Sequence, residues 1–67
     1  MKVSYIVAIA VPVEEFREAL ADVAGARLSR ELRPGQVVVV CDGPEVELAG
    51  VRGVTWVRRE RPEHLDR

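Results

Sequence analysis

The side chains that could carry out chemistry in this chain are few and far apart. Cys41 is the sole cysteine, so it has no partner for a disulfide and no second thiolate with which to share a metal ion. His64 has no cysteine or second histidine near it and is expected to be solvated. The adjacent carboxylates Glu14 and Glu15 have no nucleophile beside them and are expected at the surface. The sequence therefore predicts no catalytic centre, metal site or cofactor, and we expect a protein that is not an enzyme.

Two other residues allow both a structural and a functional interpretation. Asp42 begins the run Asp42-Gly43-Pro44, where turn and helix-cap chemistry is expected and a ligand site is the alternative. Trp56 stands in a short apolar stretch near the end of the chain, where a lone tryptophan suits the core and a contact with a partner equally well. Neither residue predicts a function by itself.

Size and charge limit the classes of protein that remain. The 67 residues form one domain with a thin stability margin, because a chain of this length buries only about 60% of the surface that its unfolded form exposes. Ten basic and eleven acidic residues are interspersed, which gives a net charge of −1 and no basic field, so nucleic acid is not an expected partner. Arginine supplies nine of the ten basic residues and asparagine is absent, a usage that fits a GC-rich or thermophilic source.

The first apolar stretch, residues 3–11, is too short to span a bilayer and has no small-residue cleavage site. We therefore expect a strand rather than a membrane anchor or an export signal, and a cytoplasmic location by default. Side chains alternate between the two sides of a strand, so one side should carry Val3, Tyr5, Val7, Ile9 and Val11. The side chains on the other side should form part of an open, apolar sheet face, and they are Ser4, Ile6, Ala8 and Ala10.

A helix is predicted over residues 13–24. Pro12 suits its first position, and Glu14 and Glu15 suit the positive end of the helix dipole. Apolar residues then recur at helical spacing until Gly25, which can end the helix.

Residues 26–33 allow a continued helix or a strand. We favour the strand, because Gly25 interrupts the helical pattern and Pro34-Gly35 is typical of a type II turn. Residues 36–41 should then form a central strand, apolar on both sides and paired antiparallel with residues 26–33. The inward residues of the earlier strand would be Ala26, Leu28 and Leu32.

Only a short second helix fits before Gly50, over residues 45–49. A last strand at residues 54–57 should join the same sheet, which gives an α+β domain of the order β-α-β-β-α-β. We expect a single domain over residues 1–60. Residues 61–67 follow the last strand as a tail that is either disordered or held by a partner.

Short motifs stand at both ends of this order. The chain opens with Tyr5-Ile6-Val7 and closes with Gly53-Val54-Thr55-Trp56-Val57, charged residues and a tail. Over essentially its whole length it thereby resembles the propeptide and inhibitor family of subtilisin-type serine proteases. The resemblance implies a ferredoxin-like open antiparallel sheet with a short second helix. It also implies a partner, a subtilisin-type protease whose two surface helices lie against the open sheet face, and a role as inhibitor or folding chaperone.

The resemblance further implies which residues contact the protease. Trp56 belongs to the closing strand, and Glu60 keeps the acidic sign with which the family caps the N-termini of the protease helices, whereas Arg58 and Arg59 depart from it. The tail would lie in the active-site cleft like a cleaved product. Its residues are Arg61, Pro62, Glu63, His64, Leu65, Asp66 and Arg67.

Two alternatives remain. A module of the same fold could associate with itself, or scaffold partners, through the open sheet face or an edge strand. Separately, residues 3–7, 14–20 and 33–43 are similar to the opening of inverting nucleotide-sugar glycosyltransferases, and the match runs on through residues 54–61. Asp42 falls at the second aspartate of their Asp-Asp-Gly-Ser turn, and Cys41 replaces the first. The chain ends before that family's metal-binding Asp-x-Asp, so this second resemblance implies a non-catalytic, nucleotide-binding relic with mostly parallel strands.

Overall fold

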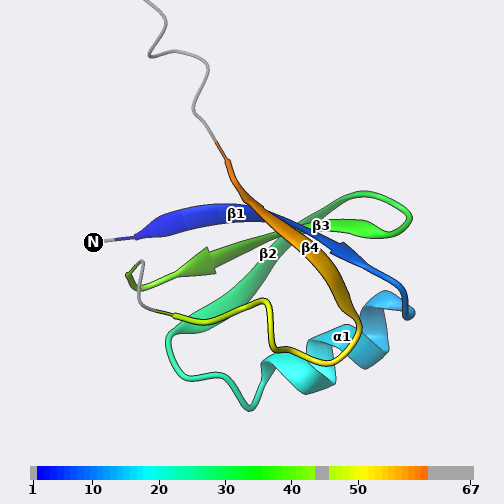
Figure 1. Cartoon of the computed structure of the whole chain (residues 1–67), viewed down its shortest axis with the longest axis horizontal. Helices are drawn as coiled ribbons and strands as arrows, with labels where there is room; N and C mark the ends of the chain where they lie inside the picture. The colour runs from blue at the N-terminus through cyan, green and yellow to red at the C-terminus, as the bar shows by residue number, and fades with distance from the viewer. Residues whose placement is uncertain (1, 44–45, 61–67) are drawn as a thin grey trace, which may run out of the picture.

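A computed structural model describes residues 2–43 and 46–60 of the chain. These residues form an α+β domain with one sheet and one helix. In chain order the elements are β1 (Val3–Ile9), α1 (Val13–Leu20), β2 (Ala26–Arg33), β3 (Gln36–Cys41) and β4 (Val54–Arg59). The four strands lie in the order β2-β3-β1-β4, all neighbouring pairs are antiparallel, and α1 lies on one side of the sheet (Figure 1).

The hydrophobic core lies between the sheet and α1. Alternation along β1 and β3 directs every second side chain to this side, and the helical spacing of α1 directs Phe16 and Leu20 toward them. The predicted inward side of the first strand is confirmed, since Val7 and Ile9 are core residues and Tyr5 packs half-buried against them. The buried cluster consists of Val7, Ile9, Phe16, Leu20, Val37, Val39, Cys41 and Leu48.

The predicted hairpin and last strand are confirmed. β2 and β3 pair antiparallel, and Pro34-Gly35 connects them. Gly35 has a φ of +87°, the positive value that a type II turn requires at its third position. β4 pairs with β1 in the same sheet, as predicted for the end of the chain. The mostly parallel strands that the glycosyltransferase alternative expects do not occur in residues 2–43 and 46–60.

Helix α1 is shorter than the predicted span of residues 13–24. It ends at Leu20, and turns lead from Ala21 to Gly25, whose φ is +83°. Val23 still packs against the core from these turns, which is why the helical spacing of apolar residues continues beyond the helix. Pro12 occupies the N-cap rather than the first helical position. The described part of the chain contains no helix with the length and apolar character needed to cross a membrane.

The predicted second helix over residues 45–49 is wrong for the residues of that span that the structure describes. Residues 46–48 are irregular and residues 49–53 form turns, with the Val51 N–H donating to the Leu48 carbonyl at 3.0 Å and the Val54 N–H donating to the Val51 carbonyl at 3.1 Å. A single helical turn is costly to nucleate, and glycines limit this segment. The segment still runs beside α1 (Figure 1) and buries Leu48 to 3% exposure.

The inward orientation predicted for Leu32 is also wrong. Its side chain is 41% exposed, whereas Ala26 and Leu28 pack against the core as predicted. The pairing of β2 with β3 shifts between Leu28 and Arg30 and again between Glu31 and Arg33. Each such bulge adds a residue to one strand and so reverses the alternation that follows it. Strict alternation from Ala26 therefore fails beyond the first bulge.

Gly53 occupies a backbone position that favours glycine, and we predict that Gly53→Ala destabilises the fold. Its φ is +89°, and a Cβ atom added there would stand 2.6 Å from Cγ2 of Val11. The left-handed backbone alone costs about 1–2 kcal/mol for a residue with a Cβ, and the displacement of Val11 adds to this. Urea denaturation of the two proteins measures the loss.

Gly50→Ala is the matched control for this prediction. An added Cβ at Gly50 meets no atom within 4 Å. The variant should therefore keep or slightly raise stability, by up to about 1 kcal/mol, because alanine restricts the unfolded chain. Equal losses in the two variants would contradict the special role of Gly53.

Candidate functional site: the helix-free face of the sheet

One side of the sheet carries no helix in the described residues, and strand pairing determines which side chains lie there. Residues opposite each other on neighbouring strands point to the same side. Val37 and Val39 belong to the core, so Val38 and Val40 point away from it. Strand register places further side chains on the same side as Val38 and Val40, and together these residues form the helix-free face. They are Arg27, Arg30, Arg33, Gln36, Val38, Val40, Ser4, Ile6, Ala8, Trp56 and Arg58.

The helix-free face has an apolar centre and a basic margin. The central strands β3 and β1 contribute its aliphatic side chains, and the edge strand β2 contributes three arginines, one in each cross-strand row. The middle row reads Arg30, Val38, Ile6 and Arg58 from one edge of the sheet to the other. Val38 is only 1% exposed although no helix covers it, so the long side chains of its row must shield it.

An ion pair crosses this face. Arg30 lies on β2 and Glu60 follows β4, at opposite edges of the sheet, yet an Nη of Arg30 donates to Oε2 of Glu60 at 3.4 Å. The outer strands of a four-stranded sheet lie about 14 Å apart, so the two side chains must extend toward each other over the central strands. Glu60 is held in place by its N–H, which donates to the Ser4 carbonyl at 2.9 Å. The carboxylate that the propeptide resemblance assigns to a partner helix is therefore already paired within the chain.

Trp56 and Arg58 form a second contact at the other edge. The guanidinium carbon of Arg58 lies 5.5 Å from the centre of the Trp56 ring, a cation–π geometry. Trp56 is 42% exposed. Trp56 therefore lies at the surface and not in the core.

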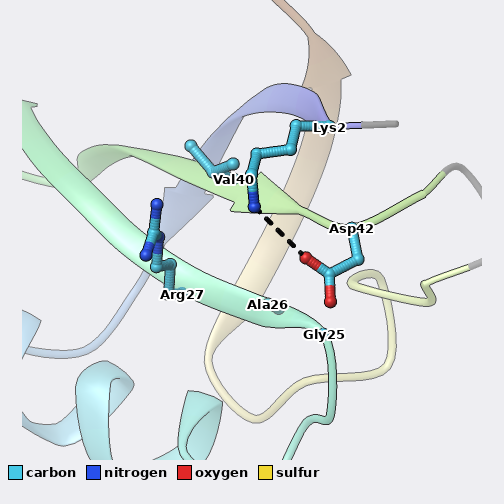
Figure 2. A pocket seen from close by; sticks show the side chains of 6 residues that line it. All are labelled: Lys2, Gly25, Ala26, Arg27, Val40 and Asp42. Atoms are coloured by element: carbon cyan, nitrogen blue, oxygen red, sulfur yellow. Dashed lines mark ion pairs between the residues drawn. The ribbon is translucent and has the colours of Figure 1, made fainter.

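A pocket of about 200 Å³ opens where β2 begins and β3 ends. Figure 2 shows Lys2 and Arg27 around Val40, and Asp42 below Lys2, with the Lys2 Nζ 3.6 Å from an Asp42 carboxylate oxygen. The backbone N–H of Asp42 donates to the Gly25 carbonyl at 2.7 Å. The backbone of Asp42 therefore joins the two strand ends, and the pocket extends the basic margin of the helix-free face.

Cys41 lies in the core, as predicted, with no exposed surface. Burial, and secondly the negative charge of Asp42, raise the pKa of its thiol. The thiol therefore stays neutral and unreactive in the folded protein. No group of three or more His, Cys, Asp or Glu side chains that could hold a metal ion occurs in residues 2–43 and 46–60.

The structure places only part of the predicted contact set. Trp56 and Glu60 both border the helix-free face, on or just after β4. The predicted tail contacts lie outside the described residues: Arg61, Pro62, Glu63, His64, Leu65, Asp66 and Arg67.

Sequence reasoning missed the arginines of β2. Arg27, Arg30 and Arg33 recur at every third residue, a spacing that would alternate between the two sides of a regular strand. The two bulges bring all three to the helix-free face. The spacing of three residues is visible in the sequence, but the bulges that turn the three arginines to one side of the sheet are not.

Among known proteins, an enzyme is similar to this chain over a short part of its own length. No family model matches the chain, and no solved structure matches it. The chain is similar to an IscS-like cysteine desulfurase of Mycobacterium tuberculosis, with 36% identity over 55 residues. That match covers 82% of this chain but spans only 12% of the length of the desulfurase.

Proposed function

We propose that this chain is a protein-binding domain with a ferredoxin-like fold and that it binds its partner through the helix-free face. The strand order supports the fold. β1, α1 and β2 form a split β-α-β unit with β3 inserted between its strands, as in ferredoxin-like domains. β3 and β4 flank β1 in the same way, with residues 46–53 where the second helix would lie.

The observation that carries the binding proposal is the composition of the helix-free face. Its aliphatic centre is bordered by arginines on one edge and by Trp56 with Arg58 on the other. Tryptophan and arginine dominate the binding energy of protein interfaces, and on this face both residue types stand exposed at the margin of the aliphatic centre. The core side of the sheet is already covered by α1 and Leu48, so it is not available to a partner.

The partner that we propose is a subtilisin-type serine protease. The resemblance of the opening and closing motifs supports this choice, because that family sets its open sheet face against two protease helices. β4 leads directly into Glu60 and residues 61–67. We propose that these last residues occupy the active-site cleft, with the chain acting as inhibitor or folding chaperone.

We propose binding rather than catalysis as the activity of this chain. The similarity to a cysteine desulfurase concerns 12% of that enzyme. Cys41, the sole cysteine here, is buried, and its thiol pKa is raised. A buried neutral thiol does not act as a nucleophile, so the described residues supply no reactive sulfur.

Slow-binding inhibition of a panel of subtilisin-type proteases tests the proposal. The intact chain should inhibit at least one of them. Deletion of residues 61–67 should abolish inhibition with the fold intact, and Trp56→Ala should raise the inhibition constant about tenfold or more, because the large exposed aromatic contact of the face is lost. Glu14→Gln, on the exposed side of α1, is the control and should leave inhibition unchanged. No inhibition by the intact chain at micromolar concentration would refute the protease as partner.

A further inference from the structure

The charges of this nearly neutral chain are separated in space. The basic side chains Lys2, Arg27, Arg30 and Arg58 are exposed on or beside the helix-free face. On the opposite side of the sheet, α1 carries three exposed carboxylates and one exposed arginine, Arg17. The carboxylates are Glu14, Glu15 and Glu18. The helix-free face is therefore a local positive field, which the net charge of −1 conceals.

The chemistry of the face favours an acidic polypeptide over a nucleic acid. Single-stranded nucleic acids need aromatic platforms on which bases stack, whereas the middle row of this face has aliphatic Ile6 and the buried Val38 on its central strands. Trp56 stands on the edge strand β4 and is already in contact with Arg58. Aliphatic side chains between guanidinium groups match a segment that presents apolar residues flanked by carboxylates.

The ion pair across the face suggests how such a segment would be received. Glu60 supplies a carboxylate to Arg30 over the apolar centre, where a partner's carboxylate would be expected. Arg30 and Glu60 are partly exposed, at 57% and 29% of their side chains, so the pair is open to exchange with a competing carboxylate. Its separation would also expose Val38 to an apolar side chain of the partner.

We propose that the helix-free face binds an acidic amphipathic segment of its partner and that Glu60 is an internal competitor for Arg30 which the segment displaces. The inference rests on the proposed protein-binding function and adds to it the chemistry of the partner. Glu60 would then oppose binding of the partner, whereas the propeptide resemblance implies that it contacts the partner. Removal of the Glu60 charge should strengthen binding, whereas loss of a contact would weaken it.

The test uses fluorescence anisotropy with a short helical peptide of glutamate and leucine as probe. The full chain should bind it, with affinity that falls as salt screens the charges, and should not bind a lysine and leucine peptide of the same pattern. Arg30→Gln should weaken binding about tenfold. Glu60→Gln should tighten it about two- to fivefold, the range for release of one exposed ion pair. Glu18→Gln, on α1, is the control and should change nothing, and thermal unfolding verifies that each variant is folded.

Each of the following results would refute one part of this proposal. Weaker binding by Glu60→Gln would refute the internal competitor, and equal binding of the two peptides would refute the acidic partner. Stronger binding of oligouridine than of the acidic peptide would assign the face to nucleic acid. A salt-dependent dimer mass in light scattering of the chain alone, with loss of peptide binding, would assign it to α1 of a second copy. Neither of the first two results would affect protease inhibition that depends on Trp56. A protein that still inhibits a protease therefore shows that only the acidic-segment proposal is wrong and that the proposed function stands.

Discussion

Replacement of Phe16 by alanine is expected to destabilise the fold by about 3–5 kcal/mol. Phe16 has no exposed surface and belongs to the core cluster between α1 and the sheet. Truncation of a buried phenylalanine to alanine costs about 3–5 kcal/mol, from lost burial and from the cavity that remains. A domain of 67 residues has a total stability of about 3–10 kcal/mol, so this loss removes a large part of it, and all of it at the lower end of that range.

Circular dichroism during urea denaturation measures this effect. Glu15→Ala provides the control, because Glu15 is the neighbouring residue of the same helix and is exposed. A surface change of this kind usually alters stability by less than about 0.5 kcal/mol. A Phe16→Ala protein with a near-native midpoint would show that α1 contributes little to the core, contrary to its position in the structure.

Leu48→Ala is the second large effect that we expect. Leu48 lies in the irregular segment between β3 and β4, yet its side chain is 3% exposed and belongs to the core cluster. A Leu→Ala change at a buried site costs about 2–5 kcal/mol, whatever the secondary structure of the backbone that carries it. With a urea dependence of about 1 kcal/mol per molar, the midpoint should fall by about 2 M or more.

Leu32→Ala is the matched control, since it makes the same chemical change at an exposed leucine. Leu32 is 41% exposed on the edge strand β2. The variant should lose well under about 1 kcal/mol, because little apolar surface is buried there. Equal losses for the two leucines would contradict the assignment of residues 46–53 as the cover that replaces a second helix.

Local features of the sequence were sufficient to predict most of the sheet. The alternation around Val7, the turn pair Pro34-Gly35 and the β-branched run of residues 37–40 led to the correct strands, because strand alternation and turn conformation depend on residues adjacent in the chain. Helix α1 was predicted in place but extended too far. For Trp56 the sequence left open whether the side chain is buried or exposed, and the structure places it at the surface.

The composition of the helix-free face was decided by tertiary structure. Arg30 and Glu60 are 30 residues apart in the chain, and only the pairing of β2 with β3, of β3 with β1 and of β1 with β4 brings their side chains together. Two bulges direct the arginines of β2 to one side and turn Leu32 outward. Net charge averages over all sides of the molecule, so it concealed the basic face. Strand register and bulges depend on contacts between distant segments, and local propensity carries no information about them.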